Sequence, residues 1–193
     1  TPGYNSLSNQ SLKASSYYLA VPINLSCAIT DKLALSVGFR YINANNHTKA
    51  GLTLVDKVYG LSDYPITVDY KKSANGFGGI FGLDYAVNEK LNVAIHYETK
   101  VKLVFEADDN KGSVSLETDG KKSYRDLPAV LYTGVSYKVT DKFTAALDFN
   151  YYFQKNADWG SIGDTLDVSN QAGNCYHVAL GLQYQLLPKL QVS

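Results

Sequence analysis

Strict alternation of apolar and polar residues runs through most of this 193-residue chain, and it constrains the fold more than any other feature. Between Tyr17 and Ile29, every odd-numbered position is apolar, whereas the positions between them are mostly small or polar. Successive side chains of a β-strand point to opposite faces, so this period of two predicts strands with one apolar face each. The alternation recurs over residues 33–41, 77–87, 91–105, 127–139, 143–153 and 176–186, the last with its apolar face on even positions.

Short polar turns separate these strands in pairs. In each turn the last apolar-face residue and the next one are four positions apart, which keeps both apolar faces of the hairpin on one side. The turns are Ile29-Thr-Asp-Lys-Leu33, Val87-Asn-Glu-Lys-Leu91, Val139-Thr-Asp-Lys-Phe143 and Leu186-Leu-Pro-Lys-Leu190.

Longer polar stretches rich in Gly, Asn, Asp and Lys alternate with the short turns, at residues 43–74, 108–126 and 154–174. Within the first of them, residues 52–55 and 66–70 could extend the neighbouring strands. The predicted fold is all-β: an antiparallel transmembrane β-barrel meander with short periplasmic turns and long outer loops. It would be a partial barrel, with about eight strands of a larger one.

Charged residues are excluded from the apolar face, although Asp, Glu, Lys and Arg make up 19% of the chain. A charge at the middle of a bilayer costs a barrel roughly 2–4 kcal/mol, so this exclusion predicts contact between the apolar face and lipid. The opposite face would line the lumen. The lumen-facing candidates are Arg40, Asp84, His96, Glu98, Lys100, Lys102, Glu106, Lys138 and Asp148.

Tyrosines mark one border of the predicted lipid face. Tyr85, Tyr137 and Tyr184 each precede a turn by one apolar-face step, so we expect a girdle at the periplasmic interface. A soluble β-sandwich or lipocalin-like barrel also alternates, but its strands are usually only about 5–6 residues long. The uninterrupted strand predicted over residues 91–106 is much longer and favours the membrane.

Composition excludes several other classes of protein. Lys plus Arg and Asp plus Glu both number 18, which lacks the basic excess of a nucleic-acid-binding domain. No apolar run is long enough for a transmembrane helix. Cys27 and Cys175 lie on opposite faces, so we expect no disulfide between them.

No cofactor or metal is expected. His96 and His177 share the polar face with Asp84, Asp148, Ser36 and Ser136, but no nucleophile elbow joins them into a hydrolase triad, so we expect no enzyme. Asp56, Asp63 and residues 108–110 lack the spacing of a calcium loop.

On the polar face, Glu98, Lys100, Lys102 and Glu106 could form a selectivity element or simply pair with charges on neighbouring strands. The second interpretation is favoured. Pro22 interrupts the first strand and predicts a bulge or kink.

The end of the chain predicts a fragment. A last strand opens at Leu190 and stops at Ser193, and an open sheet edge cannot persist in lipid. We therefore expect residues 1–193 to form a single β-barrel segment that lacks an N-terminal hatch and flanking strands.

Two long motifs resemble the long-chain fatty acid transporter family, which comprises FadL-type outer-membrane proteins and aromatic-hydrocarbon importers. One is NGFGGIFGLDY at residues 75–85 with EKLNVAIHYETKVKLVF at residues 89–105. The other is DLPAVLYTGVSYKV at residues 126–139, followed by DKF at 141–143 and DFNYYF at 148–153. The similarity spans roughly residues 16–192 and corresponds to a middle portion of the barrel.

The resemblance implies passive uptake of hydrophobic compounds, such as long-chain fatty acids or aromatic hydrocarbons, by a multi-pass protein of the Gram-negative outer membrane. A general porin or structural barrel without a selective ligand is the alternative. The implied partners are outer-membrane lipid, lipopolysaccharide and a hydrophobic small molecule, without nucleic acid, and the complete barrel is expected to be monomeric. No ligand contact can be carried over, because the hatch and the lateral opening of the family have no counterpart here.

Overall fold

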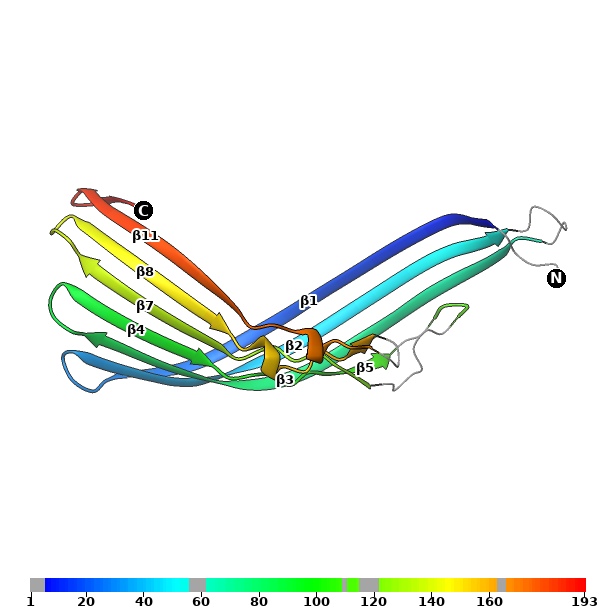
Figure 1. Ribbon diagram of the computed structural model, residues 1–193, viewed down its shortest axis with the longest axis horizontal. Coiled ribbons are helices and arrows are strands. Elements are labelled where there is room, and N and C mark those ends of the chain that lie inside the picture. Colours follow the sequence, from blue (N-terminus) through cyan, green and yellow to red (C-terminus); the bar gives the residue numbers. More distant parts are fainter. Residues whose placement is uncertain (1–5, 56–61, 109–110, 115–121, 163–165) are drawn as a thin grey trace. The chain divides into compact units, whose positions relative to one another are not determined.

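A computed structural model describes residues 6–55, 62–108, 111–114, 122–162 and 166–193 (Figure 1). Within them, no helix is long and apolar enough to span a bilayer. The strands are β1 (Ser6–Ala28), β2 (Leu33–Val55), β3 (Tyr64–Ala86), β4 (Leu91–Glu98), β5 (Val104–Asp108), β6 (Lys122–Tyr124), β7 (Val130–Lys138), β8 (Phe143–Tyr152), β9 (Ser161–Ile162), β10 (Leu166–Asp167), β11 (Cys175–Leu187) and β12 (Leu190–Val192). Two 3₁₀ turns, η1 (Gln154–Asn156) and η2 (Ser169–Gln171), complete the described elements.

The strands form the predicted meander. Their order in the main sheet is β1-β2-β3-β4-β7-β8-β11-β12, so each strand pairs with the one that precedes it along this path. β5 and β6 leave the path: β5 pairs with β3 and with β6. The predicted fold class is confirmed, including the extension of β2 through residues 52–55 and of β3 through residues 66–70.

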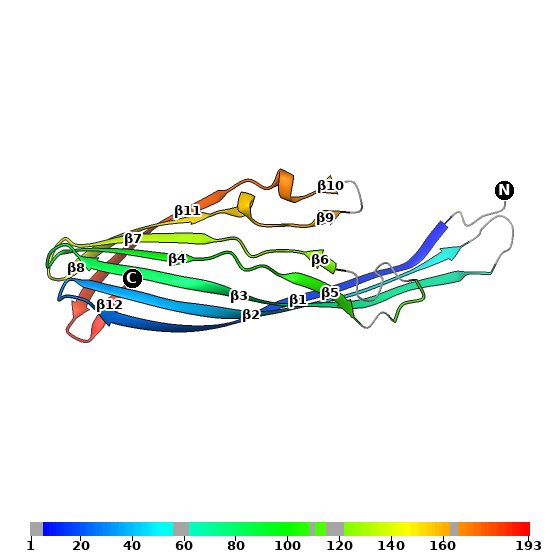
Figure 2. The same ribbon diagram turned by 90° about the horizontal axis from the view of Figure 1, so that it is seen from below.

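The chain packs as two compact units. Unit 1 comprises Thr1–Leu19, Ile42–Asn75 and Leu103–Tyr124, and unit 2 comprises Ala20–Tyr41, Gly76–Lys102 and Arg125–Ser193. β1, β2 and β3 are long enough to contribute to both. The short hairpins all belong to unit 2 and lie together at one end of it, as Figures 1 and 2 both show.

Side-chain acceptors close the hairpin turns. Thr30 Oγ1 accepts the backbone N–H groups of Lys32 and Leu33 at 3.2 and 3.0 Å. Asn88 Oδ1 and Thr140 Oγ1 do the same for the two residues that open the next strand. Each of these three turns therefore satisfies backbone donors of its own, so four residues suffice between the paired strands.

In unit 2, the apolar face of the sheet is open. The outward side chains of this unit include Val37, Ile95, Leu147 and Leu180. Leu147 is 51% exposed and Leu180 is 71% exposed. Leu19 is exposed as well, but it belongs to unit 1. A soluble sandwich would bury this face, since contiguous apolar surface on this scale is rare in water. Its exposure agrees with the predicted lipid face.

In unit 1, the polarity of the same strands is reversed. The even positions Ile42, Ala44 and Val68 are buried, and so are Leu103 and Phe105 of the same unit. The odd positions of β2 from residue 43 to residue 49 are polar instead. Unit 1 is thus built like a sheet with one covered face and one face in water.

The prediction of one strand over residues 91–106 is wrong. β4 ends at Glu98 and β5 begins at Val104. Between them, Thr99 Oγ1 accepts the N–H of Gly79 at 2.7 Å, and Val101 exchanges two backbone hydrogen bonds with Leu127. Val101 is fully buried. The alternation continues without a break because both lipid and a protein core accept apolar side chains.

Candidate functional site

The polar face of unit 2 is organised in rows that cross several strands. Cα pairing places His96 of β4 opposite Tyr132 of β7, Tyr132 opposite Asn150 of β8, and Asn150 opposite His177 of β11. The His96 and Tyr132 rings meet edge to face at 5.5 Å, and the His177 ring lies 5.1 Å from that of Tyr152. This row, which we call the bulky row, carries large side chains on the predicted lumen wall, that is, on the polar face of unit 2.

Small residues predominate in the next row of the same face, two residues closer to the short turns on β4. Pairing there runs from Asp84 through Ala94 and Gly134 to Asp148 and Ala179. A Cβ added at Gly134 would lie 2.8 Å from Asp148 Oδ1, so the absence of a side chain there makes room for the carboxylate. Asp84 Oδ2 is not free, because Asn92 Nδ2 donates a 2.8 Å hydrogen bond to it.

Two hollows adjoin at Ala94. One, of about 220 Å³, is also lined by Asp84 and His96, and the other, of about 160 Å³, is also lined by Gly134 and Asp148. We name this pair of hollows the small-residue trough. It offers space on the predicted lumen wall beneath the bulky row.

Charges on the wall are largely neutralised by partners. Arg40 Nη1 donates to Glu98 Oε2, and Arg40 Nη2 lies 3.5 Å from the Thr99 carbonyl oxygen. His96 Nε2 lies 3.3 Å from the other oxygen of Glu98. Both members of the Arg40–Glu98 pair are more than four-fifths buried, so the wall here presents little net charge.

A second ion pair lies where the strands of unit 2 end. Lys100 Nζ is 3.3 Å from Asp126 Oδ2 and donates to the Asn156 carbonyl oxygen at 2.9 Å. The same Asp126 oxygen accepts the Asp158 N–H at 3.1 Å, and the Asp126 N–H donates to the Asp158 carbonyl. Asp126 is 4% exposed, whereas its partner Lys100 reaches solvent.

The charged series Glu98, Lys100, Lys102 and Glu106 is not one ladder. Because β4 ends at Glu98, the later members separate. Glu98 pairs with Arg40, Lys100 with Asp126, and Glu106 with Lys122 at 3.1 Å in unit 1. Lys102 and Lys138 are exposed. Three members of this series therefore form ion pairs with residues of other segments, while their exposure to a lumen stays a prediction.

Aromatic rings border the apolar face at both ends. Tyr85, Tyr137 and Tyr184 are exposed next to the short turns, where the sequence places them. The sequence prediction missed the opposite border, where ring contacts connect the strands. These contacts are Tyr41–Phe77, Tyr97–Phe153, Tyr151–Phe153, Phe149–Tyr151 and Phe149–Tyr176. The sequence signal that could have located this border is, on each strand, the last aromatic residue before the apolar face becomes polar.

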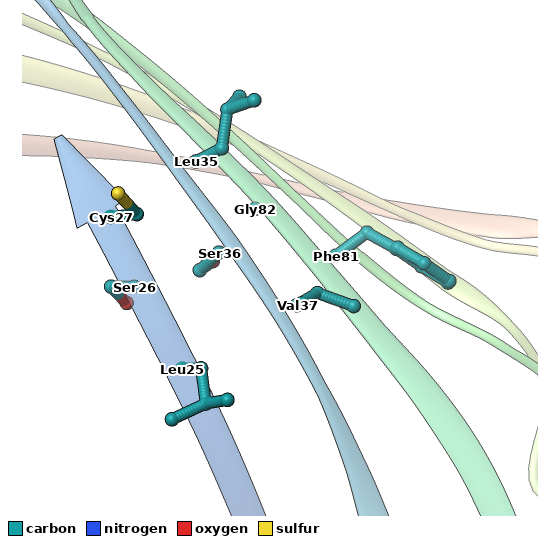
Figure 3. Close-up of a pocket in the computed structure, with 8 residues that line it drawn as sticks. All are labelled: Leu25, Ser26, Cys27, Leu35, Ser36, Val37, Phe81 and Gly82. Atoms are coloured by element: carbon teal, nitrogen blue, oxygen red, sulfur yellow. The ribbon is translucent and has the colours of Figure 1, made fainter. Parts of the chain in front are cut away.

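A further hollow spans β1, β2 and β3 (Figure 3). It measures about 490 Å³, and its lining is mainly aliphatic and aromatic. It is lined by Leu25, Ser26, Cys27, Leu35, Ser36, Val37, Phe81 and Gly82.

Neither cysteine forms a disulfide, and no group of three or more His, Cys, Asp or Glu in the described part of the chain is placed to hold a metal ion. Of the loop residues considered for calcium, residues 56, 109 and 110 lie outside the described residues.

An acidic side chain in unit 1 predicts a pH response. Hydrogen bonds from His47 and then Lys49 hold the pKa of Asp69 below its ordinary value. A carboxyl with a lowered pKa stabilises the folded state above the unfolded pKa of about 3.9 and loses this effect as pH falls through the folded value. The protection of the β2–β3 amides against hydrogen exchange, relative to the intrinsic exchange rate at each pH, should therefore decrease below about pH 4. In Asp69→Asn that acid-dependent step should be absent, and an unchanged step would contradict the assignment.

No family model matches the chain. Outer membrane protein P1 of Haemophilus influenzae is 26% identical over 89% of this chain and 44% of its own length. The crystal structure of the Ralstonia pickettii toluene transporter TbuX superposes with a TM-score of 0.64 over 92% of this chain and 54% of that one, at 18% identity. A Pseudomonas aeruginosa FadL homologue gives the same TM-score over 92% and 48%, at 10% identity. The chain thus spans about half the length of these proteins, which are outer-membrane barrels and transporters rather than enzymes.

Proposed function

We propose that this chain, an outer-membrane β-barrel segment with the fold of FadL-type transporters, belongs to a barrel that takes up hydrophobic compounds passively. The observation that carries this proposal is the shared fold over 92% of the chain with a toluene transporter and a FadL homologue. Long-chain fatty acids and aromatic hydrocarbons are the proposed substrate classes. The proposed surroundings are outer-membrane lipid, with the complete barrel acting as a monomer.

The wall of unit 2 is compatible with passage of apolar molecules. Two of its charges, those of Arg40 and Glu98, are paired with each other and mostly buried, so neither offers a free ion to water or solutes. The small-residue trough removes bulk from the wall around Ala94. An apolar solute gains from a surface with few unpaired polar groups, because it cannot replace the hydrogen bonds that such groups make with water.

Filling the trough tests this role. Ala94→Trp would place a large ring between Asp84 and Asp148, so we expect uptake to fall severalfold. Ile95→Trp is the matched control, because the next residue of β4 carries its side chain on the exposed apolar face. There an indole is tolerated by lipid.

The measurement is uptake of radiolabelled oleate and toluene by cells that express the complete barrel or each variant at equal surface level. Influx of a small hydrophilic solute is followed in parallel. Loss of hydrophobic uptake in Ala94→Trp alone supports the proposal. Equal transport in both variants would remove the trough from the pathway, and rapid hydrophilic influx that Ala94→Trp blocks would favour a general porin.

A further inference from the structure

The outward face of β2 and β3 changes from apolar to polar within two residues. On β2 the last outward aromatic residue is Tyr41, and on β3 the corresponding one is Phe77; their rings are 5.2 Å apart. The next outward positions are Asn43 and Asn75, joined by a 2.8 Å hydrogen bond from Asn43 Nδ2 to Asn75 Oδ1. The aromatic pair marks where this face leaves the hydrocarbon layer.

Beyond the asparagines, the polar side chains of this face are connected to each other. Asn45 Nδ2 donates to Asn43 Oδ1 at 2.7 Å. His47 Nε2 lies 2.7 Å from Asp69 Oδ1, and Lys49 Nζ lies 2.9 Å from Asp69 Oδ2. On the other face of these strands, Ile42, Ala44, Val68 and Ala74 are buried, so this part of the polar face is a platform preorganised on a packed support.

Lysines gather on the platform. Ser16 Oγ donates to Asn46 Oδ1 at 2.6 Å, and the Ser11 Oγ lies beside Gly51. Both contacts follow one antiparallel register, which sets Lys13 of β1 opposite Lys49 of β2. Lys71 lies two residues beyond Asp69 on the same face of β3. Lys13, Lys49 and Lys71 are all exposed.

We propose that this platform, formed by Asn43, Asn45, His47, Asp69, Asn75 and the lysines 13, 49 and 71, binds the phosphorylated sugars of lipopolysaccharide in the outer leaflet. Lysine ammonium groups contact the phosphates, and the asparagine amides contact sugar hydroxyls. Asp69 orients His47 and Lys49 toward the ligand. The inference rests on the outer-membrane location and not on the substrate of the barrel.

Charge and hydrogen-bonding groups identify the occupant. Within unit 1, the exposed lysines 13, 49 and 71 share one face of β1, β2 and β3 with asparagine amides. Such a face suits a ligand that carries both phosphates and hydroxyl groups. In the outer leaflet the layer outside the hydrocarbon consists of acidic, phosphate-bearing sugars, to which basic surface residues are attracted electrostatically.

The test compares two triple variants of the complete barrel in detergent. Lys13→Gln, Lys49→Gln and Lys71→Gln together remove the charge of the platform. Lys32→Gln, Lys90→Gln and Lys142→Gln remove the same charge from the short turns, at the opposite ends of the strands. Binding of rough lipopolysaccharide with a phosphorylated inner core is measured by native mass spectrometry, with the same lipid after dephosphorylation as the second ligand.

The platform variant should lose affinity for phosphorylated lipopolysaccharide about tenfold or more, and the turn variant should keep it. Wild-type affinity should fall with dephosphorylation and with added salt. Equal binding by both variants, or binding indifferent to the phosphates, would overturn the proposal. Uptake of oleate or toluene should be the same in both variants at equal surface level, so failure here is separate from failure of the transport proposal.

Discussion

Replacing Leu147 with arginine is expected to destabilise the folded barrel in vesicles by about 2–4 kcal/mol. Leu147 lies on the exposed apolar face of β8, where its Cα partners are Val135 and Leu180. Aromatic borders lie on both sides of it along the strand, so its side chain is near the middle of the hydrocarbon layer. A guanidinium there must be desolvated or must draw water and headgroups into the bilayer.

Ala146→Arg is the matched control for this substitution. Ala146 is the preceding residue of β8 and lines the small-residue trough on the opposite face. Its arginine would extend toward polar wall residues, so we expect a change well below that of Leu147→Arg. The free energy of unfolding is measured by urea titration, with the fluorescence of Trp159, the single tryptophan of this chain, as one signal. Equal costs at both positions would contradict the assignment of the two faces.

Replacing Asp126 with alanine should cost about 2–3 kcal/mol of stability. The carboxylate is buried, accepts the Asp158 N–H and pairs with Lys100. Its removal leaves the Asp158 N–H without this acceptor and the Lys100 ammonium without its counter-charge. The cost stays below that of a fully buried pair, because Lys100 can turn to solvent.

Glu106→Gln provides the control for the Asp126 substitution. Glu106 and Lys122 form an ion pair of similar length, but both side chains are more than half exposed. Exposed pairs contribute about 0–1 kcal/mol, so Glu106→Gln should hardly change the free energy of unfolding. A double-mutant cycle with Lys100→Gln should give a coupling energy to Asp126 that exceeds that of the Glu106–Lys122 pair. Equal coupling in the two pairs would show that burial of Asp126 contributes nothing.

The hairpins were predictable because their chemistry is local. A Thr or Asn three residues before the next strand accepts two backbone N–H groups of that strand, and the spacing of apolar residues around it determines the faces. Strand order then follows from antiparallel pairing of neighbours. The positions of Tyr85, Tyr137 and Tyr184 next to the turns were predictable for the same reason, whereas their contact with a membrane interface stays a prediction.

The candidate site was predictable only in part. Parity along the strands assigned His96, Glu98 and Asp84 to one face, but it did not indicate that Glu98 would pair with Arg40. Nor did it indicate that Asp126, which lies in a stretch interpreted as a loop, would be buried against Lys100. Such contacts depend on registers between strands that are far apart in sequence.

Sequence alone determined which residues share a face of each strand, because an extended chain alternates its side chains whatever surrounds it. Only the tertiary structure decided what covers each face. Leu147 and Val101 are both apolar residues in an odd-numbered series, yet one is open to lipid and the other is buried by protein. Hydrocarbon and a protein core solvate an apolar side chain almost equally well, so hydrophobicity does not distinguish them. The distinction arises beyond the end of β4, where Val101 forms an isolated bridge with Leu127, a partner that lies far away in the chain.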